Sequence, residues 1–213
     1  MNTETNAFDF TRDWFSNNIP RWTKHILRAR SLKGQQVEAL ELGCFEGRSA
    51  IWLLQNVLTH PKAHITCIDN FSKFKEMKNQ PAPGETKKRF LSNTKQFGSK
   101  VSLVEMDTRD ALKTQQLLNK SFDFIYIDAG RHSKNVLEDA ILAFPLLKVG
   151  GYIVFDDYTS NEKHDYTCPK KGIDAFLDIF SDELHVRNSS WQVIAKKKKA
   201  SRSSRNGCKS ELD

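Results

Sequence analysis

The stretch VEALELGCFEGRSAIWLL, residues 37–54, decides the fold, because it joins an apolar run to a helical pattern through a glycine turn. The run at 37–42 has β character and carries Glu41 next to its end, Gly43 follows, and Gly47 comes four residues later. A strand, a glycine turn and a helix in this order are typical of nucleotide-binding α/β folds. The spacing of the glycines indicates which nucleotide the turn can hold.

The rest of the chain alternates in the same way. Further β-type runs lie at 64–69, 101–107, 122–128, 151–157, 183–188 and 190–197, and helical spacing is found at 49–58, 136–147 and 173–180. Apolar strands that alternate with amphipathic helices predict an α/β fold with a parallel sheet covered on both faces. The last two runs are separated by little more than Ser189 and predict an antiparallel hairpin at a sheet edge.

The composition is that of one water-soluble domain. The chain has 213 residues, of which 38% are hydrophobic and 28% charged, and this length can bury a core without disulfides. No apolar run is long enough to cross a bilayer, and the first residues lack a secretion signal, so we expect a cytoplasmic protein without a membrane partner. The four cysteines form no CxxC pair and predict neither zinc nor disulfides.

Three regions are expected along the chain. Residues 1–35 are rich in aromatic side chains and predict a helical cap, which either simply packs on the domain or forms a wall of the substrate pocket. Residues 36–199 form the main domain. Residues 200–213 predict a disordered basic tail, and the net charge of the whole chain is +7. Such a tail can grip nucleic acid or merely aid solubility, and the second interpretation is favoured.

The turn itself excludes two phosphate-binding motifs. A triphosphate loop has four residues between its glycines and then a lysine, whereas three residues separate Gly43 from Gly47, and Arg48 follows. A dinucleotide turn needs a glycine where this chain has Phe45. S-adenosylmethionine fits better, because Gly43 and Gly47 let its amino-acid portion pass closely, the next helix offers amides to its carboxylate, and Glu41 can lie near its ammonium group.

Acidic residues stand at the ends of the four later parallel strands. Asp69 ends the second strand, where its carboxylate can accept hydrogen bonds from both ribose hydroxyls, and Asp107 ends the third, where it can meet the adenine. Asp128 ends the fourth strand, and the pair Asp156-Asp157 ends the fifth. Because the carboxyl ends of parallel strands meet at one rim, these carboxylates would repel one another. A sulfonium cofactor and a cation would neutralise them.

Together these features resemble the class I S-adenosylmethionine-dependent methyltransferases, and more narrowly the branch labelled methyltransferase domain 24. The matching phrases are ALELGCFEGRSAIWLLQNVLTHP, ITCIDNF, FDFIYIDAGRHSKNVLEDAILAFPLLKVGGYIVFDDY and IDAF. The resemblance implies a Rossmann-like seven-stranded sheet, mostly parallel with a C-terminal antiparallel hairpin, and methyl transfer. With the arguments above, the expected cofactor contacts are Glu41, Gly43, Gly47, Ser49, Asp69, Asp107 and Asp128.

The acids after the fourth and fifth strands also suggest how an acceptor hydroxyl loses its proton. Asp128, Asp156 and Asp157 form an oxygen-rich set that suits Mg²⁺ or another divalent cation, and related metal-dependent O-methyltransferases have acids at matching positions. The alternative is that the Asp156-Asp157 pair caps the next segment. The family commonly has the sequence Asp-Gly-x-His after the fourth strand, whereas this chain has Asp-Ala-Gly-Arg-His at residues 128–132. Either His132 has shifted by one place or Arg131 takes its position, and we expect Asp128, His132 and Asp156 to be catalytic.

The preferred function is O-methylation of a small hydroxylated molecule, such as a sugar or secondary metabolite. The basic charge keeps open an RNA methyltransferase, and loss of catalysis would leave a cofactor-binding module. The loop at 71–90 contains several lysines, among them Lys73, Lys75 and Lys78, which could close over an anionic substrate or simply be solvated. The oligomeric state is left open, a homo-oligomer included.

Overall fold

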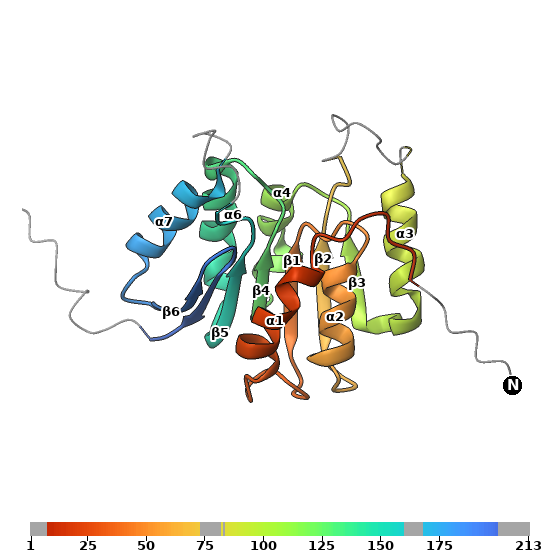
Figure 1. Ribbon diagram of the computed structural model, residues 1–213, viewed down its shortest axis with the longest axis horizontal. Coiled ribbons are helices and arrows are strands. Elements are labelled where there is room, and N and C mark those ends of the chain that lie inside the picture. Colours follow the sequence, from red (N-terminus) through yellow and green to blue (C-terminus); the bar gives the residue numbers. More distant parts are fainter. Residues whose placement is uncertain (1–7, 73–81, 83, 160–167, 200–213) are drawn as a thin grey trace, which may run out of the picture.

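The computed structural model describes residues 8–72, 82, 84–159 and 168–199. Within them the chain folds into one seven-stranded sheet with helices on both faces (Figure 1). The expected basic tail and the three loop lysines, Lys73, Lys75 and Lys78, lie outside the described residues.

The sheet has the strand order β3-β2-β1-β4-β5-β7-β6. Its strands are β1 (Glu38–Leu42), β2 (His64–Ile68), β3 (Val101–Val104), β4 (Phe122–Ile127), β5 (Leu147–Phe155), β6 (Leu184–Ser189) and β7 (Val193–Lys197). The first five are parallel, and β7 runs antiparallel to both β5 and β6. The predicted sheet and its terminal hairpin are confirmed, with β6 at the edge.

Helices cover the two faces of the sheet and create two buried clusters. One face carries η1 (Ser16–Asn18), α1 (Ile19–Trp22), η2 (Thr23–Leu27), α2 (Arg48–Asn56), α3 (Glu85–Thr94) and η3 (Lys95–Lys100). The other carries α4 (Thr108–Leu112), α5 (Gln115–Leu118), α6 (Ser133–Ala143), η4 (Phe144–Leu146) and α7 (Pro169–Ile179). Within the described residues, no helix is both long and apolar enough to span a membrane.

The N-terminal helices share the core of the main domain. Trp22 of α1 is fully buried and meets Phe15, Phe124 and Tyr126 with its ring nearly perpendicular to Phe15 and Tyr126. Its indole N–H donates a hydrogen bond of 2.7 Å to the Gln192 side-chain oxygen. The expected cap is therefore built into the same hydrophobic cluster as β1 and β4.

One helix is shorter than its pattern suggests. The spacing at 136–147 predicts a helix to Leu147, but α6 ends at Ala143. Pro145 cannot supply the amide that the next turn needs, so a short 3₁₀ turn follows and β5 starts at Leu147. The three cysteines of the described residues, Cys44, Cys67 and Cys168, are free and buried.

Candidate active site

A cavity of about 940 Å³ opens at the carboxyl ends of the parallel strands. Among the described residues, its lining contains seven aspartates and three arginines, together with aromatic side chains and asparagines. The acids are Asp13, Asp69, Asp107, Asp128, Asp139, Asp156 and Asp157, and the arginines are Arg21, Arg109 and Arg131. Parallel α/β sheets bind ligands at this edge, and the acid excess favours a cationic ligand.

The glycine turn after β1 passes close to the backbone that follows β4. Gly43 has a φ of +84°, and a Cβ atom there would lie 2.6 Å from the carbonyl oxygen of Asp128. Only glycine fits this close approach, and Gly43 lines the cavity. Gly47, with a φ of +86°, packs against Phe90 of α3 and is not part of the cavity lining.

The carboxylate of Asp69 fastens this turn to the end of β2. One of its oxygens accepts hydrogen bonds from the amides of Cys44 (3.0 Å) and Phe45 (2.9 Å), and the other accepts from the amide of Phe71 (2.7 Å). A carboxylate has about four acceptor positions, and backbone amides take three of them. Asp69 lines the cavity as expected, but its main partners in the structure are backbone amides, which leaves little capacity for two ribose hydroxyls.

Glu41 and Ser49 lie behind the turn instead of facing the cavity. Glu41 is fully buried and accepts hydrogen bonds from the hydroxyl of Ser49 and the thiol of Cys67. Burial raises the pKa of Glu41 to about 8, so the protonated form of this carboxyl predominates at neutral pH. The expectation that Glu41 meets the ammonium group of the cofactor does not agree with this position, and neither Glu41 nor Ser49 lines the cavity.

Backbone strain is concentrated around the same rim. Phe45, Phe71 and Asp157 have φ values of 47°, 52° and 56°, and they are the non-glycine residues with positive φ in the described part of the chain. They follow β1, β2 and β5 within a few residues. Strained residues at a cavity rim are typical of functional sites.

Asp107 lines the cavity but is strongly paired. It caps α4, and its two carboxylate oxygens both accept hydrogen bonds of 2.9 Å from the guanidinium of Arg109. These bonds hold the pKa of Asp107 below its ordinary value. Arg109 also donates to Asn135 of α6, so α4 and α6 are tied together at the adenine end that the sequence predicted. A contact of Asp107 with adenine stays a prediction.

A buried hydrogen-bond network ends at Asp156. The hydroxyl of Tyr126 donates to Asp156, and the side-chain amide of Gln192 lies 3.5 Å from that hydroxyl. Asn18 Nδ2 lies 3.5 Å from one oxygen of the Asp156 carboxylate. The other oxygen accepts a hydrogen bond of 2.7 Å from the amide of Asp157. Burial raises the pKa of Asp156, and the Tyr126 hydrogen bond opposes that rise. Asp156 is thus a nearly buried carboxyl group at the wall of the cavity.

The described acids do not form a metal site. Asp128 and Asp156 are bridged by the hydroxyl of Tyr126, which is 3.3 Å from Asp128, while Asp157 faces Arg131 at 3.4 Å. Within the described ranges, no three His, Cys, Asp or Glu side chains are grouped closely enough to hold an ion. The predicted ligand set of Asp128, Asp156 and Asp157 therefore does not fit a metal in this arrangement, since Arg131 pairs with Asp157 and the neutral Tyr126 hydroxyl lies between Asp128 and Asp156.

Of the two alternatives after the fourth strand, Arg131 is the residue that faces the cavity. Arg131 lines it, whereas His132 is exposed at the start of α6 and does not. The structure therefore does not bring His132 together with Asp128 and Asp156, because His132 is the exposed N-cap residue of α6.

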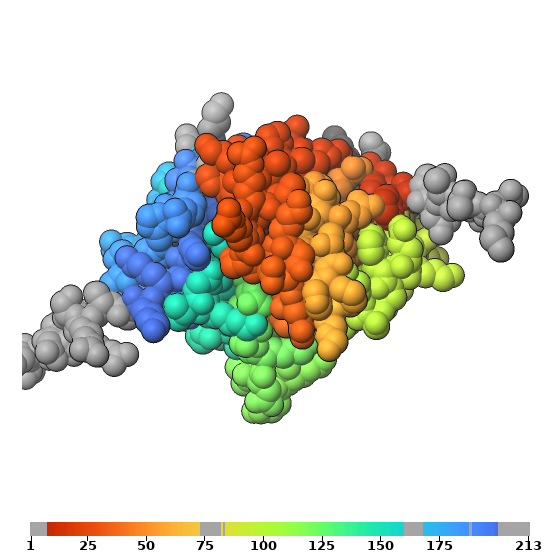
Figure 2. Space-filling view, turned by 90° about the horizontal axis from the view of Figure 1, so that it is seen from below, coloured from red at the N-terminus to blue at the C-terminus, as the bar shows by residue number. Residues whose placement is uncertain are grey.

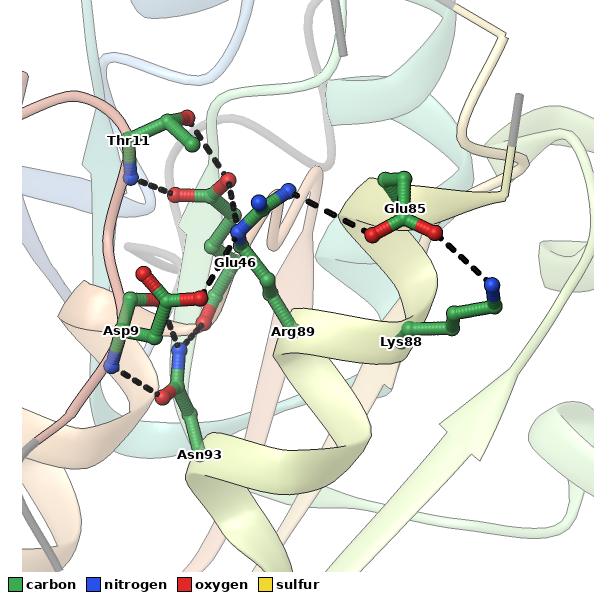
Figure 3. Close-up of polar contacts among 7 residues, drawn as sticks. All are labelled: Asp9, Thr11, Glu46, Glu85, Lys88, Arg89 and Asn93. Carbon is green, nitrogen blue, oxygen red and sulfur yellow. Dashed lines mark hydrogen bonds and ion pairs between the residues drawn. The ribbon is translucent and has the colours of Figure 1, made fainter. Parts of the chain in front are cut away.

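The N-terminal segment is fastened beside the glycine turn (Figure 3). Thr11 donates to the buried carboxylate of Glu46 from both its amide and its hydroxyl, each at 2.7 Å. Asn93 of α3 exchanges hydrogen bonds with the backbone of Asp9, and Arg89 donates to the Asp9 side chain at 3.0 Å. Glu46 is the acid inside the glycine turn, so the turn holds the segment in place.

This attachment makes the N-terminal segment a wall of the cavity. Trp14 packs on Phe45 of the glycine turn with ring centres 4.9 Å apart, and Asp13 pairs with Arg48 at 3.4 Å. Trp14 lines the cavity together with Asn18 of η1. The segment packs on the domain and also lines the cavity. That this cavity receives a substrate stays a prediction.

Sequence reasoning missed several residues of the cavity. Arg21, Asp139 and Trp191 line it, and burial raises the pKa of Asp139 to about 6. None of the three directly follows a parallel strand, so the pattern of acids at strand ends does not predict them. The aromatic run before β1 was the signal for the N-terminal wall, whereas no local pattern marks Asp139 or Trp191.

Comparisons with known proteins agree with this geometry. The family described as "Methyltransferase domain" (Methyltransf_24) matches residues 40–158, more than half of the chain. The comparison with curated proteins gives no match.

Solved structures share the fold at low sequence identity. An O-methyltransferase from Bacillus cereus in complex with SAH is 18% identical, with 90% of this chain and 84% of that chain covered and a TM-score of 0.62. The O-methyltransferase TomG from Streptomyces achromogenes, in complex with SAM, is 17% identical, with coverage of 77% and 74% and a TM-score of 0.55. MycE, a methyltransferase of the mycinamycin biosynthetic pathway in complex with Mg, SAH and mycinamycin VI, is 14% identical, with coverage of 94% and 54% and a TM-score of 0.62.

We predict that Glu41→Gln removes a pH dependence of stability. Because the pKa of Glu41 rises from 4.5 to about 8 on folding, the folded protein keeps a proton that the unfolded chain loses above pH 4.5. This contribution to the free energy of unfolding is fully present below pH 4.5 and is lost as the pH rises to about 8. The slope from this group is at most about 1.4 kcal/mol per pH unit. Urea unfolding across this range measures it.

Glu105→Gln is the matched control, since the Glu105 side chain is half exposed. It should leave the slope of the unaltered protein intact. An equal slope for the Glu41→Gln variant and the unaltered protein would show that Glu41 is ionised in the folded state.

Proposed function

The chain belongs to the methyltransferase-domain family of class I S-adenosylmethionine-dependent enzymes, and on this premise we propose that it methylates a hydroxyl oxygen of a small molecule, such as a sugar or secondary metabolite. The observation that carries the proposal is the nearly buried carboxyl group of Asp156 at the cavity wall, held by Tyr126. A cavity of about 940 Å³ with Trp14 and Trp191 in its lining has the size and aromatic character of small-molecule sites.

The cofactor half of the cavity is assigned to the rim between β1 and β3. S-adenosylmethionine, when bound, supplies an electrophilic methyl group on a sulfonium centre. Gly43 allows a close approach of the backbone, and Asp69 keeps the turn in shape by holding its amides. The surplus of aspartates over arginines in the lining suits a ligand that carries a positive charge.

The acceptor half is assigned to the wall formed by Asn18, Asp156 and Trp191. In-line transfer requires the acceptor oxygen to lie on the far side of the methyl group, and the walls hold it there and exclude water. Asp156 takes the proton of the acceptor hydroxyl as that oxygen attacks. Burial raises the pKa of Asp156, which makes this carboxylate a stronger base than an exposed one.

Tyr126 and its partners position this base. Burial raises the pKa of Tyr126 well above its ordinary value, so its phenol keeps the proton that it donates to Asp156. Gln192 lies between Tyr126 and Trp22, which ties the base to the N-terminal wall. Asp128, whose carboxylate shares the Tyr126 hydroxyl, lies toward the cofactor half.

The first test of the proposal combines cofactor binding with a screen of acceptors. Calorimetry should detect binding of S-adenosylmethionine, and labelled cofactor should transfer its methyl group to a member of a panel of hydroxylated small molecules. Binding without turnover on any acceptor would favour a non-catalytic module. Because the described acids do not gather as metal ligands, a chelator should leave the turnover unchanged.

Asp156→Asn should reduce kcat by about 10²- to 10⁴-fold, the usual contribution of a general base. Cofactor affinity should stay the same, because Asp156 is placed in the acceptor half. His132→Ala is the control, since His132 is exposed and outside the cavity lining, and it should retain full activity. Turnover of the Asp156→Asn variant at the rate of the unaltered enzyme would contradict the assignment.

Tyr126→Phe should move the acidic limb of the pH profile of kcat to higher pH. The hydrogen bond from Tyr126 stabilises the ionised form of Asp156, so its loss raises the pKa of that base. Tyr152→Phe, on the neighbouring strand, is the matched control, because Tyr152 is buried and no hydrogen bond from its hydroxyl to Asp156 is present. If both variants keep the profile of the unaltered enzyme, Tyr126 does not position the base.

A further inference from the structure

Two segments without acidic residues come together beside the cavity. Residues 14–37 contain five lysines and arginines and no aspartate or glutamate, and the same is true of residues 184–199. The hydrogen bond from Trp22 to Gln192 joins them. Figure 2 shows the N-terminal segment, in red to orange, beside the C-terminal strands in blue. Their positive charges therefore share one side of the molecule.

The electrostatic surroundings of His25 on η2 show how close these charges are. Its pKa is lowered first by burial and then by the charges of Lys24, Arg187 and Arg21. Arg187 comes from β6, whereas the other two belong to the N-terminal helices. Cations from both segments thus act on a single side chain.

A hollow of about 650 Å³ extends this surface along η2 and the turn after it. Arg28, Arg30 and Lys33 line the hollow, with no acidic side chain among the described residues of its wall. All three are exposed. Cations that converge on a hollow without acids form a site for an anion.

We call this surface the basic face and define it by Arg21, Lys24, Arg28, Arg30, Lys33, Arg187 and Lys196. In the described part of the chain, none of the seven has an acidic partner within 4.0 Å. Some lysines elsewhere are paired with acids, as Lys87 is with Glu105 and Lys148 with Asp123. The basic face therefore carries positive charge that no nearby acid among the described residues offsets.

We propose that the basic face binds the phosphate backbone of single-stranded nucleic acid. Arg21 lies on α1 and Arg28 directly follows η2, the next helical segment along the chain, and a ligand with several phosphates can meet both. Arg21 and the exposed Trp191 also line the mouth of the cavity, where an aromatic ring can stack on a base.

A membrane surface fits the basic face less well. Between residues 15 and 37, no large apolar side chain is exposed in the structure, and an interfacial helix needs such side chains to enter the lipid. The proposal goes beyond the proposed function, because binding a nucleic-acid strand on this surface does not require the strand to be the methyl acceptor.

The test measures binding of the full-length protein to a fluorescein-labelled single-stranded RNA of mixed sequence, by fluorescence anisotropy at several salt concentrations. The affinity should fall steeply with salt, because each neutralised phosphate of a single strand contributes about −0.7 to the slope of log K against log salt. A variant with Arg28→Glu and Lys33→Glu should bind about tenfold more weakly or worse, and its slope should be shallower by about 1.4, for two lost phosphate contacts.

A variant with Lys95→Glu and Lys113→Glu is the matched control. It carries the same change of charge, but Lys95 lies near the β3 edge and Lys113 follows α4 on the opposite face. This control should bind RNA as the unaltered protein does. Both double variants should keep their unfolding midpoints and their affinity for S-adenosylmethionine. Because calorimetry measures cofactor binding independently of RNA binding, a failure of the proposed function can be distinguished from a failure of this proposal.

Three results would overturn the proposal. Undiminished binding by the Arg28→Glu and Lys33→Glu variant would place the contact outside the basic face. An equal loss of RNA affinity in both double variants would show that the net charge of the protein, and not the basic face, determines binding. Binding to vesicles that contain phosphatidylserine, without binding to RNA or to a DNA strand of the same sequence, would assign the surface to lipid. Binding to both RNA and DNA strands supports the backbone contact, and binding to RNA alone adds a contact with the 2′-hydroxyl.

Discussion

The hydrogen bonds accepted by the carboxylate of Asp69 are the interaction on which the shape of the cavity depends. It reaches from the end of β2 to the backbone amides of Cys44 and Phe45, and so fixes the turn that leaves β1. Hydrogen bonds to a charged group contribute roughly 1.5–3 kcal/mol each, which helps to hold Phe45 at its positive φ. Trp14 then packs on Phe45, and the N-terminal wall takes its position from this contact.

Charge is separated across the N-terminal wall. The cavity side is acidic, and part of its repulsion is relieved because Asp107 is paired with Arg109 and Asp157 with Arg131. The outer side is the basic face, where cations lack acidic partners. Arg21 belongs to both sides, since it lines the cavity and its charge acts on His25 together with Lys24 and Arg187. The short N-terminal helices thus form a wall of the cavity on one side and carry part of the basic face on the other.

The fold could be predicted because local patterns and their order sufficed. Strand and helix patterns alternate, parallel strands end at one rim, and the acids that follow β2 to β5 therefore meet there. The direction of Glu41 could not be predicted in this way. Side chains of a strand alternate between faces, and Glu41 points with Ala39 toward the α2 side, where Ser49 meets it. An acid at a strand end was therefore mistaken for one at the rim.

From the order of its residues alone, this chain could be assigned to its family, its sheet and most of its rim acids, because these depend on short-range periodicity and on the common direction of parallel strands. Tertiary structure decided which carboxyl groups have a raised pKa, since burial raises the pKa values of Glu41 and Asp156. It also decided that two distant segments without acids share one surface. Such contacts join residues far apart in the chain, and no local pattern encodes them.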